Sequence, residues 1–311
     1  MSSFVVTGAN GFVGRHLCRH LTSLGHEVRG LRRGPDQALG TVSVEYRDSA
    51  ALTESFRGGD VLIHCAGRAH ILGKDVPDAA ARYTAVNVEL TMRLVQAAEA
   101  AGVHRFVFIS TAGVLGRHSG ASELTDDSPE KPHDLYSSSK RDAEIRLAQF
   151  GLDSRIGITV VRPVLVYGPG AKGNFGRLVR MIRRGWPLPI GGVHGRRSLI
   201  GVRNLCDLIA ACALRPEGKG MTLVAADREV TTQAVLARDI GFALGRPARV
   251  VDVPDGVLSR LLTGVGRRRD YERLTDDFIV RPERARTELG WHQPHDRASE
   301  LRWALREGEP G

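Results

Sequence analysis

The residues whose types and spacing most clearly suggest chemistry are a tyrosine and a lysine four positions apart. Tyr136 and Lys140 fall in a segment, 136–150, that is predicted to be a helix, so their side chains are neighbours on one helix face. A nearby ammonium group favours the tyrosinate and brings the phenol pKa, normally about 10, closer to neutrality. Such a tyrosine can exchange a proton with a carbonyl or alcohol oxygen while hydride moves at the attached carbon. The pair therefore forms a candidate catalytic site, although the same spacing also occurs on ordinary helix surfaces.

A third candidate catalytic residue is Thr111, which directly follows a predicted strand over 103–110. Ligands bind at the carboxyl ends of strands in open α/β sheets. The Thr111 hydroxyl can there hold a substrate oxygen beside Tyr136, and the alternative is a polar residue that only opens a loop. The next predicted strand, 159–166, ends in a Gly-Pro turn at the same edge of the sheet.

The N-terminal segment predicts a dinucleotide site. A short strand ends at Thr7, and glycines at positions 8, 11 and 14 lead into a helix. Glycines in this arrangement permit a tight turn and close contact with a ligand, and the helix N-terminus attracts a phosphate group. A lone G-x-x-G-x-x-G is weak evidence, but its position between a strand and a helix makes it much stronger. The alternative is an ordinary glycine-rich turn.

The end of the second predicted strand bears on the choice of cofactor. An acidic residue there accepts hydrogen bonds from the adenosine ribose, whereas an arginine accommodates a 2′-phosphate. This chain has Arg32 and Arg33 at that point and no carboxylate. The sequence therefore favours NADP, and NAD stays open because both arginines could simply face solvent.

Apolar patterns indicate how these residues are positioned. Predicted strands at 42–46, 60–67, 103–110 and 159–166 alternate with predicted helices at 50–56, 79–101 and 136–150. This alternation implies a Rossmann-type, doubly wound α/β fold with a parallel sheet covered by helices on both faces.

The rhythm changes beyond Gly168. We predict an NAD(P)-binding domain over 1–168, to which a later segment of about 196–215 returns, and a smaller C-terminal α/β substrate lobe over 169–311. The elements predicted there are a strand at 221–225 and helices near 175–184, 204–214, 231–244 and 255–263.

Composition narrows the class of partner. The 311 residues include 44 basic and 35 acidic side chains, for a formal charge of +9, which suits anionic ligands. Only residues 267–269 form a dense basic run and no nucleic-acid motif accompanies it, so we expect phosphorylated small molecules and no nucleic acid. Four scattered cysteines indicate reduced thiols in the cytoplasm and no metal site. No apolar run approaches the roughly 20 residues of a membrane span, and we recognise no signal peptide.

These motifs together resemble the extended short-chain dehydrogenase/reductase superfamily, in its NAD-dependent epimerase/dehydratase branch. The shared motifs cover nearly the whole chain: 7–14 (TGANGFVG), 63–67 (IHCAG), 86–88 (VNV), Ser110-Thr111, Tyr136-x-x-x-Lys140, 162–169 (RPVLVYGP), 173–175 (GNF), 197–200 (RSLI), 202–207 (VRNLCD) and 288–291 (ELGW). Within that branch, 187–189 (PLP), Asn174 and 196–198 (RRS) are similar to the UDP-glucose 4-epimerase-like and UDP-sugar 4-keto-reductase subgroup of bacterial polysaccharide biosynthesis.

The resemblance implies a role for each matching residue. Tyr136 is then the acid/base, Lys140 binds the nicotinamide ribose, and Thr111 hydrogen-bonds a sugar oxygen. Asn174 and Arg197 match positions that contact the nucleotide diphosphate. The residues implied to contact or shape the cofactor site are Gly8, Asn10, Gly11, Phe12, Val13, Arg32, Ala66, Asn87, Lys140 and Pro163. The helices at 79–101 and 136–150 resemble those that form a homodimer interface in this superfamily.

The resemblance also narrows the reaction. Dehydratases of this branch generally carry an Asp-Glu pair after the threonine, whereas Ala112 and Gly113 follow Thr111 here. The expected chemistry is therefore hydride transfer at sugar C4, by a 4-epimerase or a 4-keto reductase, with a nucleotide-sugar substrate. The sequence leaves these two reactions open. The alternative function is a non-catalytic NADP-binding regulatory protein, although such proteins commonly lack the Tyr–Lys pair that this chain keeps.

Overall fold

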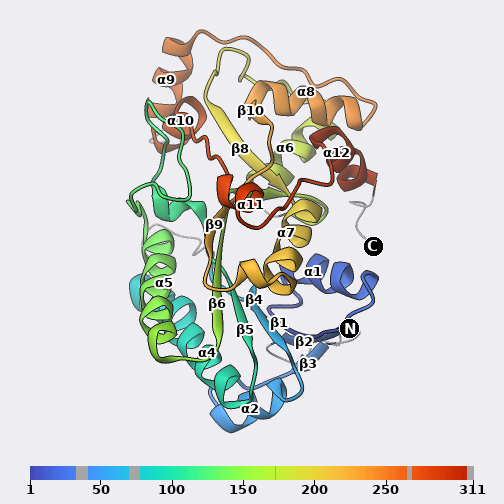
Figure 1. The fold of residues 1–311 in the computed structure, drawn as a ribbon. Coiled ribbons are helices and arrows are strands. Elements are labelled where there is room, and N and C mark those ends of the chain that lie inside the picture. The colour runs from blue at the N-terminus through green and yellow to red at the C-terminus, as the bar shows by residue number, and fades with distance from the viewer. Residues whose placement is uncertain (33–40, 70–77, 172, 265–267, 307–311) are drawn as a thin grey trace.

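The structure is a computed structural model that describes residues 1–32, 41–69, 78–171, 173–264 and 268–306 (Figure 1). Arg33, which the sequence pairs with Arg32 at the end of the second strand, lies outside the described residues. So does Arg267, the first residue of the basic run 267–269.

A seven-stranded parallel sheet carries the N-terminal part of the chain, in the order β3-β2-β1-β4-β5-β6-β9. Its strands are β1 (Ser3–Thr7), β2 (Glu27–Arg32), β3 (Thr41–Ser43), β4 (Val61–His64), β5 (Arg105–Ile109), β6 (Gly157–Pro163) and β9 (Thr222–Ala225). Successive side chains of a strand point to opposite faces, and in β1 Phe4 and Val6 join one core cluster while Val5 joins another. The predicted Rossmann-type fold class is confirmed.

Helices cover both faces of this sheet (Figure 1). On one face α1 (Phe12–Ser23) packs against α7 (Val202–Leu214), and on the other α2 (Ser49–Phe56), α4 (Leu90–Ala100) and α5 (Leu135–Asp153) pack together. The helix predicted over 79–101 is continuous but consists of three parts: α3 (Ala79–Tyr83), a π-helical segment η1 (Thr84–Glu89) and α4. Single π-helical turns of this kind occur frequently at functional sites. Two short 3₁₀ turns, η2 (Ala112–Leu115) and η3 (Pro216–Gly218), complete this part.

A second, three-stranded sheet lies at the opposite end of the molecule (Figure 1). It contains β7 (Leu165–Tyr167), β8 (Arg196–Gly201) and β10 (Val230–Thr232), with β7 parallel and β10 antiparallel to β8. The helices in this half are α6 (Asn174–Arg183), α8 (Gln233–Ala243), α9 (Asp255–Gly264), α10 (Arg268–Thr275), α11 (Glu283–Thr287) and α12 (Arg297–Arg306). A third core cluster, which includes Tyr167, Phe175 and Leu236, fills the space between this sheet and its helices.

The strand predicted over 159–166 is two strands. β6 ends at Pro163, and β7 begins at Leu165 in the other sheet. Proline has no backbone N–H to donate to a ladder, so it is a natural end for a strand. The chain returns to the first sheet through α7 and β9, whereas β8 stays in the second sheet. The predicted division at residue 168 remains a prediction.

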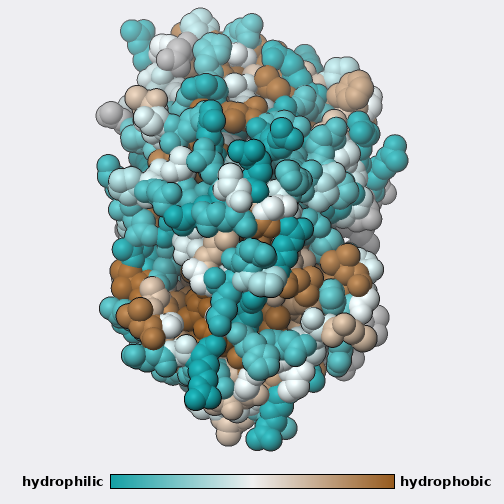
Figure 2. Space-filling view, viewed as in Figure 1, coloured by the Kyte–Doolittle hydropathy of each residue, from teal (hydrophilic) through white to brown (hydrophobic). Residues whose placement is uncertain are grey.

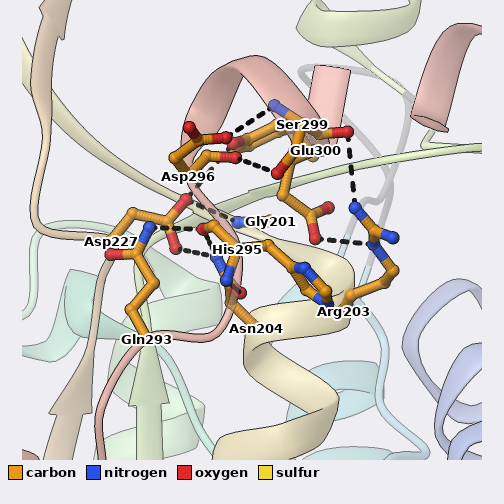
Figure 3. A network of polar contacts seen from close by, with 10 residues as sticks. Gly201, Arg203, Asn204, Asp227, Gln293, His295, Asp296, Ser299 and Glu300 are labelled. Atoms are coloured by element: carbon orange, nitrogen blue, oxygen red, sulfur yellow. Dashed lines mark hydrogen bonds and ion pairs between the residues drawn. The ribbon is translucent and has the colours of Figure 1, made fainter. Parts of the chain in front are cut away.

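A polar network fastens the C-terminal segment to the start of α7 (Figure 3). The Asn204 Nδ2 group donates to Asp227 Oδ1 (2.8 Å) and to the His295 carbonyl (2.9 Å), while His295 N–H donates to Asn204 Oδ1 (3.1 Å). Arg203 Nε donates to Glu300 Oε1 at 2.8 Å, and its guanidinium lies over the ring of a tryptophan in α12. The motif over 202–207 therefore has a structural role in joining the end of the chain to the sheet.

Candidate active site

The glycine turn between β1 and α1 is too tight for side chains. A Cβ at Gly14 would lie 2.2 Å from the Gly8 carbonyl oxygen, and one at Gly8, where φ is +71°, would lie 2.7 Å from the Ala66 nitrogen. The turn therefore lies directly against the segment that follows β4. Asn10 and Gly11 are exposed, and no side chain caps α1, so the first N–H groups of α1 can bind a phosphate.

Tyr136 lies in the first turn of α5, which Asp134 and Ser137 fix in place. The Asp134 carboxylate accepts hydrogen bonds from Ser137 N–H and Ser137 Oγ–H, each at 2.7 Å. Lys140 follows one turn later and is almost fully buried. Its ammonium group donates to the Ile109 carbonyl at 2.8 Å and lies 4.4 Å from the centre of the Phe108 ring. Lys140 thus reaches the carboxyl end of β5, one helical turn after Tyr136.

The pKa values of Lys140 and Tyr136 differ from those expected from their spacing. Burial lowers the pKa of Lys140 to about 8, against the opposing effects of Glu144 and Cys65. Burial also raises the pKa of Tyr136, and Asp134 and Tyr83 raise it further. In the protein alone, the Tyr136 pKa is therefore not shifted towards neutrality, because loss of solvent around the phenol raises it.

Thr111 lies two residues after the end of β5 and directly before η2. Its Oγ1 accepts a hydrogen bond from Gly113 N–H at 3.1 Å and so caps η2. A Cβ at Gly113 would lie 3.3 Å from Thr111 Oγ1 and 3.6 Å from Ser137 Cβ. Gly113 therefore lies close both to Thr111 and to the first turn of α5.

Tyr83 belongs to the same cluster and was missed from the sequence. Its ring centre lies 6.3 Å from that of Tyr136. The available signal was its position four residues before Asn87 on one predicted helix, which places both residues on one face.

Asn87 links the segment after β4 to α5 and is fully buried. Its Oδ1 accepts from Arg68 N–H at 2.8 Å, and its Nδ2 donates to the Arg68 carbonyl at 3.1 Å and to Ser139 Oγ at 2.9 Å. A Cβ at Gly67 would lie 3.3 Å from Lys140 Nζ and 3.5 Å from Asn87 Oδ1. Asn87 therefore shapes the site through its neighbours.

A buried hydrogen-bond chain, which sequence reasoning also missed, connects β1 to Asn87. His64 lies 2.6 Å from Thr7 Oγ1 through Nδ1 and 3.1 Å from Thr91 Oγ1 through Nε2. Thr91 donates its own proton to the Asn87 carbonyl (2.8 Å), so it accepts from Nε2–H, and Nδ1 accepts from Thr7. This assignment leaves His64 neutral, in agreement with a pKa held well below its usual value by burial and by Lys140. We call the four residues Thr7, His64, Thr91 and Asn87 the Thr7–Asn87 chain.

The remaining predicted cofactor residues lie at the end of β2, at the start of α1 and at the end of β6. Arg32 ends β2, where it is nearly buried and donates from Nε to Thr41 Oγ1 at 2.8 Å. Phe12 and Val13 pack partly buried against the core at the start of α1. Pro163 is buried at the end of β6.

The two predicted diphosphate contacts lie in the second half of the molecule. Asn174 is exposed at the first residue of α6, and Arg197 in β8 donates from Nη2 to the Asp276 carbonyl at 3.3 Å. An open cavity of about 570 Å³ is lined in part by His194, which precedes Arg197 by three positions, and by Asp252.

The described residues offer neither a metal site nor a membrane span. Among them, no group of three or more histidine, cysteine, aspartate or glutamate side chains could hold a metal ion. No helix of the described chain is both long enough and apolar enough to cross a membrane.

Comparison with known proteins shows which family the sequence matches. The family described as NAD dependent epimerase/dehydratase matches residues 4–225. The chain belongs to this family. A curated relative, UDP-glucose 4-epimerase of Vibrio cholerae, is 32% identical over 300 residues, which are 94% of this chain and 91% of the relative.

Solved structures confirm the fold at lower identity. UDP-N-acetylglucosamine 4-epimerase from Bacillus cereus superposes with a TM-score of 0.81 at 16% identity, over 99% of both chains. MoeE5 in complex with UDP-glucose and NAD superposes with a TM-score of 0.74 at 21% identity, over 98% of both chains. The expected membership of the NAD-dependent epimerase/dehydratase branch is confirmed by the family match, and these structures show the same fold.

Proposed function

We propose that this family member transfers hydride at C4 of a UDP-hexose or UDP-N-acetylhexosamine, as a 4-epimerase or a 4-keto reductase. The observation that carries the proposal is the contact of Lys140 with the carboxyl end of β5, one helical turn after Tyr136 and two residues before Thr111. The similarity to UDP-glucose 4-epimerase over nearly all of both chains supports the nucleotide-sugar class.

The proposed roles follow from the contacts. Tyr136 takes the proton of the substrate 4-hydroxyl when that carbon is oxidised, and returns it to the oxygen when the ketone is reduced. Thr111 donates its hydroxyl proton to the same oxygen. Lys140 places a positive charge beneath the site and holds the end of β5 through Ile109. A bound nicotinamide dinucleotide would supply the hydride acceptor and donor of this chemistry, and the positive charge of its oxidised form would favour ionised Tyr136.

The glycine turn fits the phosphates of such a dinucleotide, because only backbone lies between Gly8, Gly14 and Ala66. We propose NADP as the cofactor, since Arg32 ends β2 where a carboxylate would favour NAD. NAD is the alternative, and MoeE5, which is similar in fold, was solved with NAD. Asn174 and Arg197 are the proposed contacts to the diphosphate of the sugar.

We further propose a cytoplasmic homodimer that serves surface polysaccharide biosynthesis. α5 exposes apolar side chains, with Ile145 37% and Leu152 84% exposed, and Figure 2 shows apolar surface over the region of α4 and α5. Helices with such faces bury them in a partner. Sedimentation that gives a monomer across the working concentration range would exclude this assembly.

One experiment separates the two reactions. The purified protein is denatured and the released dinucleotide identified, and native protein is then incubated with a UDP-4-keto-sugar and NADPH. Tightly bound NAD together with interconversion of UDP-sugar C4 epimers indicates an epimerase, whereas stoichiometric consumption of NADPH indicates a reductase. Dinucleotide binding without turnover of any nucleotide sugar would contradict both reactions and favour the non-catalytic regulator.

A further inference from the structure

Three arginines lie on one exposed face of α6 and its C-terminal cap. Arg177, Arg180 and Arg184 follow the spacing i, i+3 and i+7, which places them on one side of the helix, and all three are exposed. The opposite side of α6 is apolar, and Phe175 and Val179 bury their side chains there in the third core cluster. The orientation of the helix is thus fixed by its apolar side, and the arginines face outward.

A second segment extends this face. Arg246 donates from Nη1 to the Arg183 carbonyl, and Leu188 N–H donates to the Arg249 carbonyl at 2.8 Å, so residues 246–249 lie beside the end of α6. Trp186 is 51% exposed, and the Arg184 guanidinium lies 5.5 Å from its ring centre. We call the set the basic surface, and its members are Arg177, Arg180, Arg184, Trp186, Arg246 and Arg249.

No acidic group neutralises this basic surface in the described part of the chain. Residues 173–190 contain no aspartate or glutamate, and among the described residues none of the surface's arginines forms an ion pair. Exposed arginines elsewhere are often paired with a carboxylate, as are Arg57, Arg93 and Arg196. Like charges three and four residues apart on a helix repel each other. An external anion relieves this repulsion, so the uncompensated cluster is complementary to an anionic partner.

We propose that the basic surface binds the surface of a membrane that contains anionic phospholipids. From Arg177 to Arg184 the arginines line about 10 Å of helix, and residues 246–249 widen the charged area beside it, which suits an extended plane of charge. Arginine binds lipid phosphates at such a plane, and a half-exposed tryptophan is typical of the depth at which headgroups meet the acyl chains. This attachment is peripheral, and it does not depend on the proposed reaction.

The composition of the same face argues against a nucleic-acid partner. Between Arg177 and Trp186 the chain carries no asparagine, glutamine or serine, residues that commonly accompany arginine in contacts to a nucleic-acid backbone. Binding to nucleic acid is therefore kept as an outcome that would overturn the membrane proposal.

Vesicle co-sedimentation of the full chain tests the proposal. We expect binding to vesicles of phosphatidylcholine with phosphatidylglycerol, weaker binding as salt increases, and no binding to phosphatidylcholine alone. A Lys or Arg near an anionic membrane contributes on the order of a fivefold factor, so Arg177→Glu/Arg180→Glu/Arg184→Glu should weaken binding about a hundredfold or more. Trp186→Ala should weaken binding by a smaller factor.

A matched control has the same net charge but leaves α6 intact. Arg47, Arg155 and Arg286 are exposed and form no ion pair in the described part of the chain, and the control replaces these three with glutamate. Equal losses in both triple variants, or no binding of the native protein to anionic vesicles at low salt, would overturn the proposal. Tighter binding to an oligonucleotide that is abolished by the α6 substitutions would overturn it in favour of nucleic acid. If the glutamate triple does not show native circular dichroism, the corresponding glutamine triple replaces it.

Discussion

The Lys140 ammonium group donates a hydrogen bond to the carbonyl oxygen of Ile109, 2.8 Å away. Ile109 ends β5, and Thr111 follows two residues later, so the lysine holds the segment that carries a proposed substrate contact. The same hydrogen bond links the first half of α5 to the carboxyl end of β5. Lys140 therefore has two separable roles, one that depends on its charge and one that depends on the hydrogen bonds of its amine.

The charge of Lys140 gives a pH prediction. Its pKa is lowered from 10.5 to about 8 by burial, so the positive charge is present below pH 8 and is lost as pH rises through 8. We expect kcat and the affinity for dinucleotide to fall above about pH 8. Titration calorimetry with the dinucleotide and steady-state rates across this pH range measure both. Lys140→Met should abolish the transition, and a transition that persists in that variant would contradict the assignment.

Stability should change in the opposite direction in this window. The folded-state pKa lies below the unfolded one, so the unfolded chain binds more protons between about pH 8 and 10.5. The contribution of Lys140 to the free energy of unfolding therefore increases as pH rises through this window. Urea unfolding at several pH values, compared with Lys140→Met, isolates that contribution.

Tyr136→Phe tests the proposed acid/base. The substitution removes only the phenol hydroxyl, and we expect kcat to fall by roughly two to four orders of magnitude. Among the described residues no protein group forms a hydrogen bond with that hydroxyl, so the free energy of unfolding should change little. Dinucleotide affinity serves as the internal control and should stay within about threefold, since a change below 1 kcal/mol is expected for a group that contacts only the substrate. Near-normal turnover of the true substrate would exclude Tyr136 from catalysis.

The parallel sheet and the glycine turn were predictable because their signals are local. Buried β-branched runs mark β1, β4, β5 and β6, and a glycine turn at this spacing between a strand and a helix is specific to few kinds of site. The second sheet was harder to predict. β8 contains two arginines and a serine, and β10 has only three residues, so neither shows an apolar period. Their pairing depends on residues far apart in the chain, which no short pattern encodes.

The buried polar residues of the site were also beyond sequence reasoning. His64 at the end of an apolar run does not reveal its partners, because these come from β1 and α4. The pKa of Tyr136 could not be predicted from the Tyr–Lys spacing alone, since burial depends on the whole cluster. In both cases the sequence contains the local motif, but the surrounding residues come from distant parts of the chain and could not be predicted from it.

The Thr7–Asn87 chain gives a prediction about positioning. Thr91→Val removes both the acceptor for His64 Nε2–H and the donor to the Asn87 carbonyl, and leaves the volume nearly unchanged. Loss of a partner for a buried polar group costs about 1–3 kcal/mol of unfolding free energy. Because Asn87 holds Ser139 in α5, we also expect kcat to fall about tenfold or more through misplacement of Tyr136.

Thr91→Ser is the matched control, because it keeps the hydroxyl and loses only a methyl group. It should recover most of the rate and of the stability. A rate that stays native in Thr91→Val, despite lower stability, would show that the chain serves folding alone.

The last prediction concerns Asp227, whose carboxylate accepts hydrogen bonds from Gly201 N–H (2.9 Å) and Asn204 Nδ2 (Figure 3). It also accepts one from Tyr167 OH. Burial nevertheless raises its pKa from 3.8 to about 7, with Glu300 raising it as well. The folded state therefore retains a proton that the unfolded chain has lost between pH 3.8 and about 7, and the free energy of unfolding should fall as pH rises through this window. The slope approaches about 1.4 kcal/mol per pH unit for one proton.

Urea unfolding of two variants tests whether this slope comes from Asp227. Asp227→Asn should remove the slope, because the amide cannot ionise, while Asp142→Asn at an exposed position of α5 should leave it unchanged. Equal slopes in the native protein and in Asp227→Asn would show that Asp227 is ionised throughout, with its three donors outweighing the cost of burial.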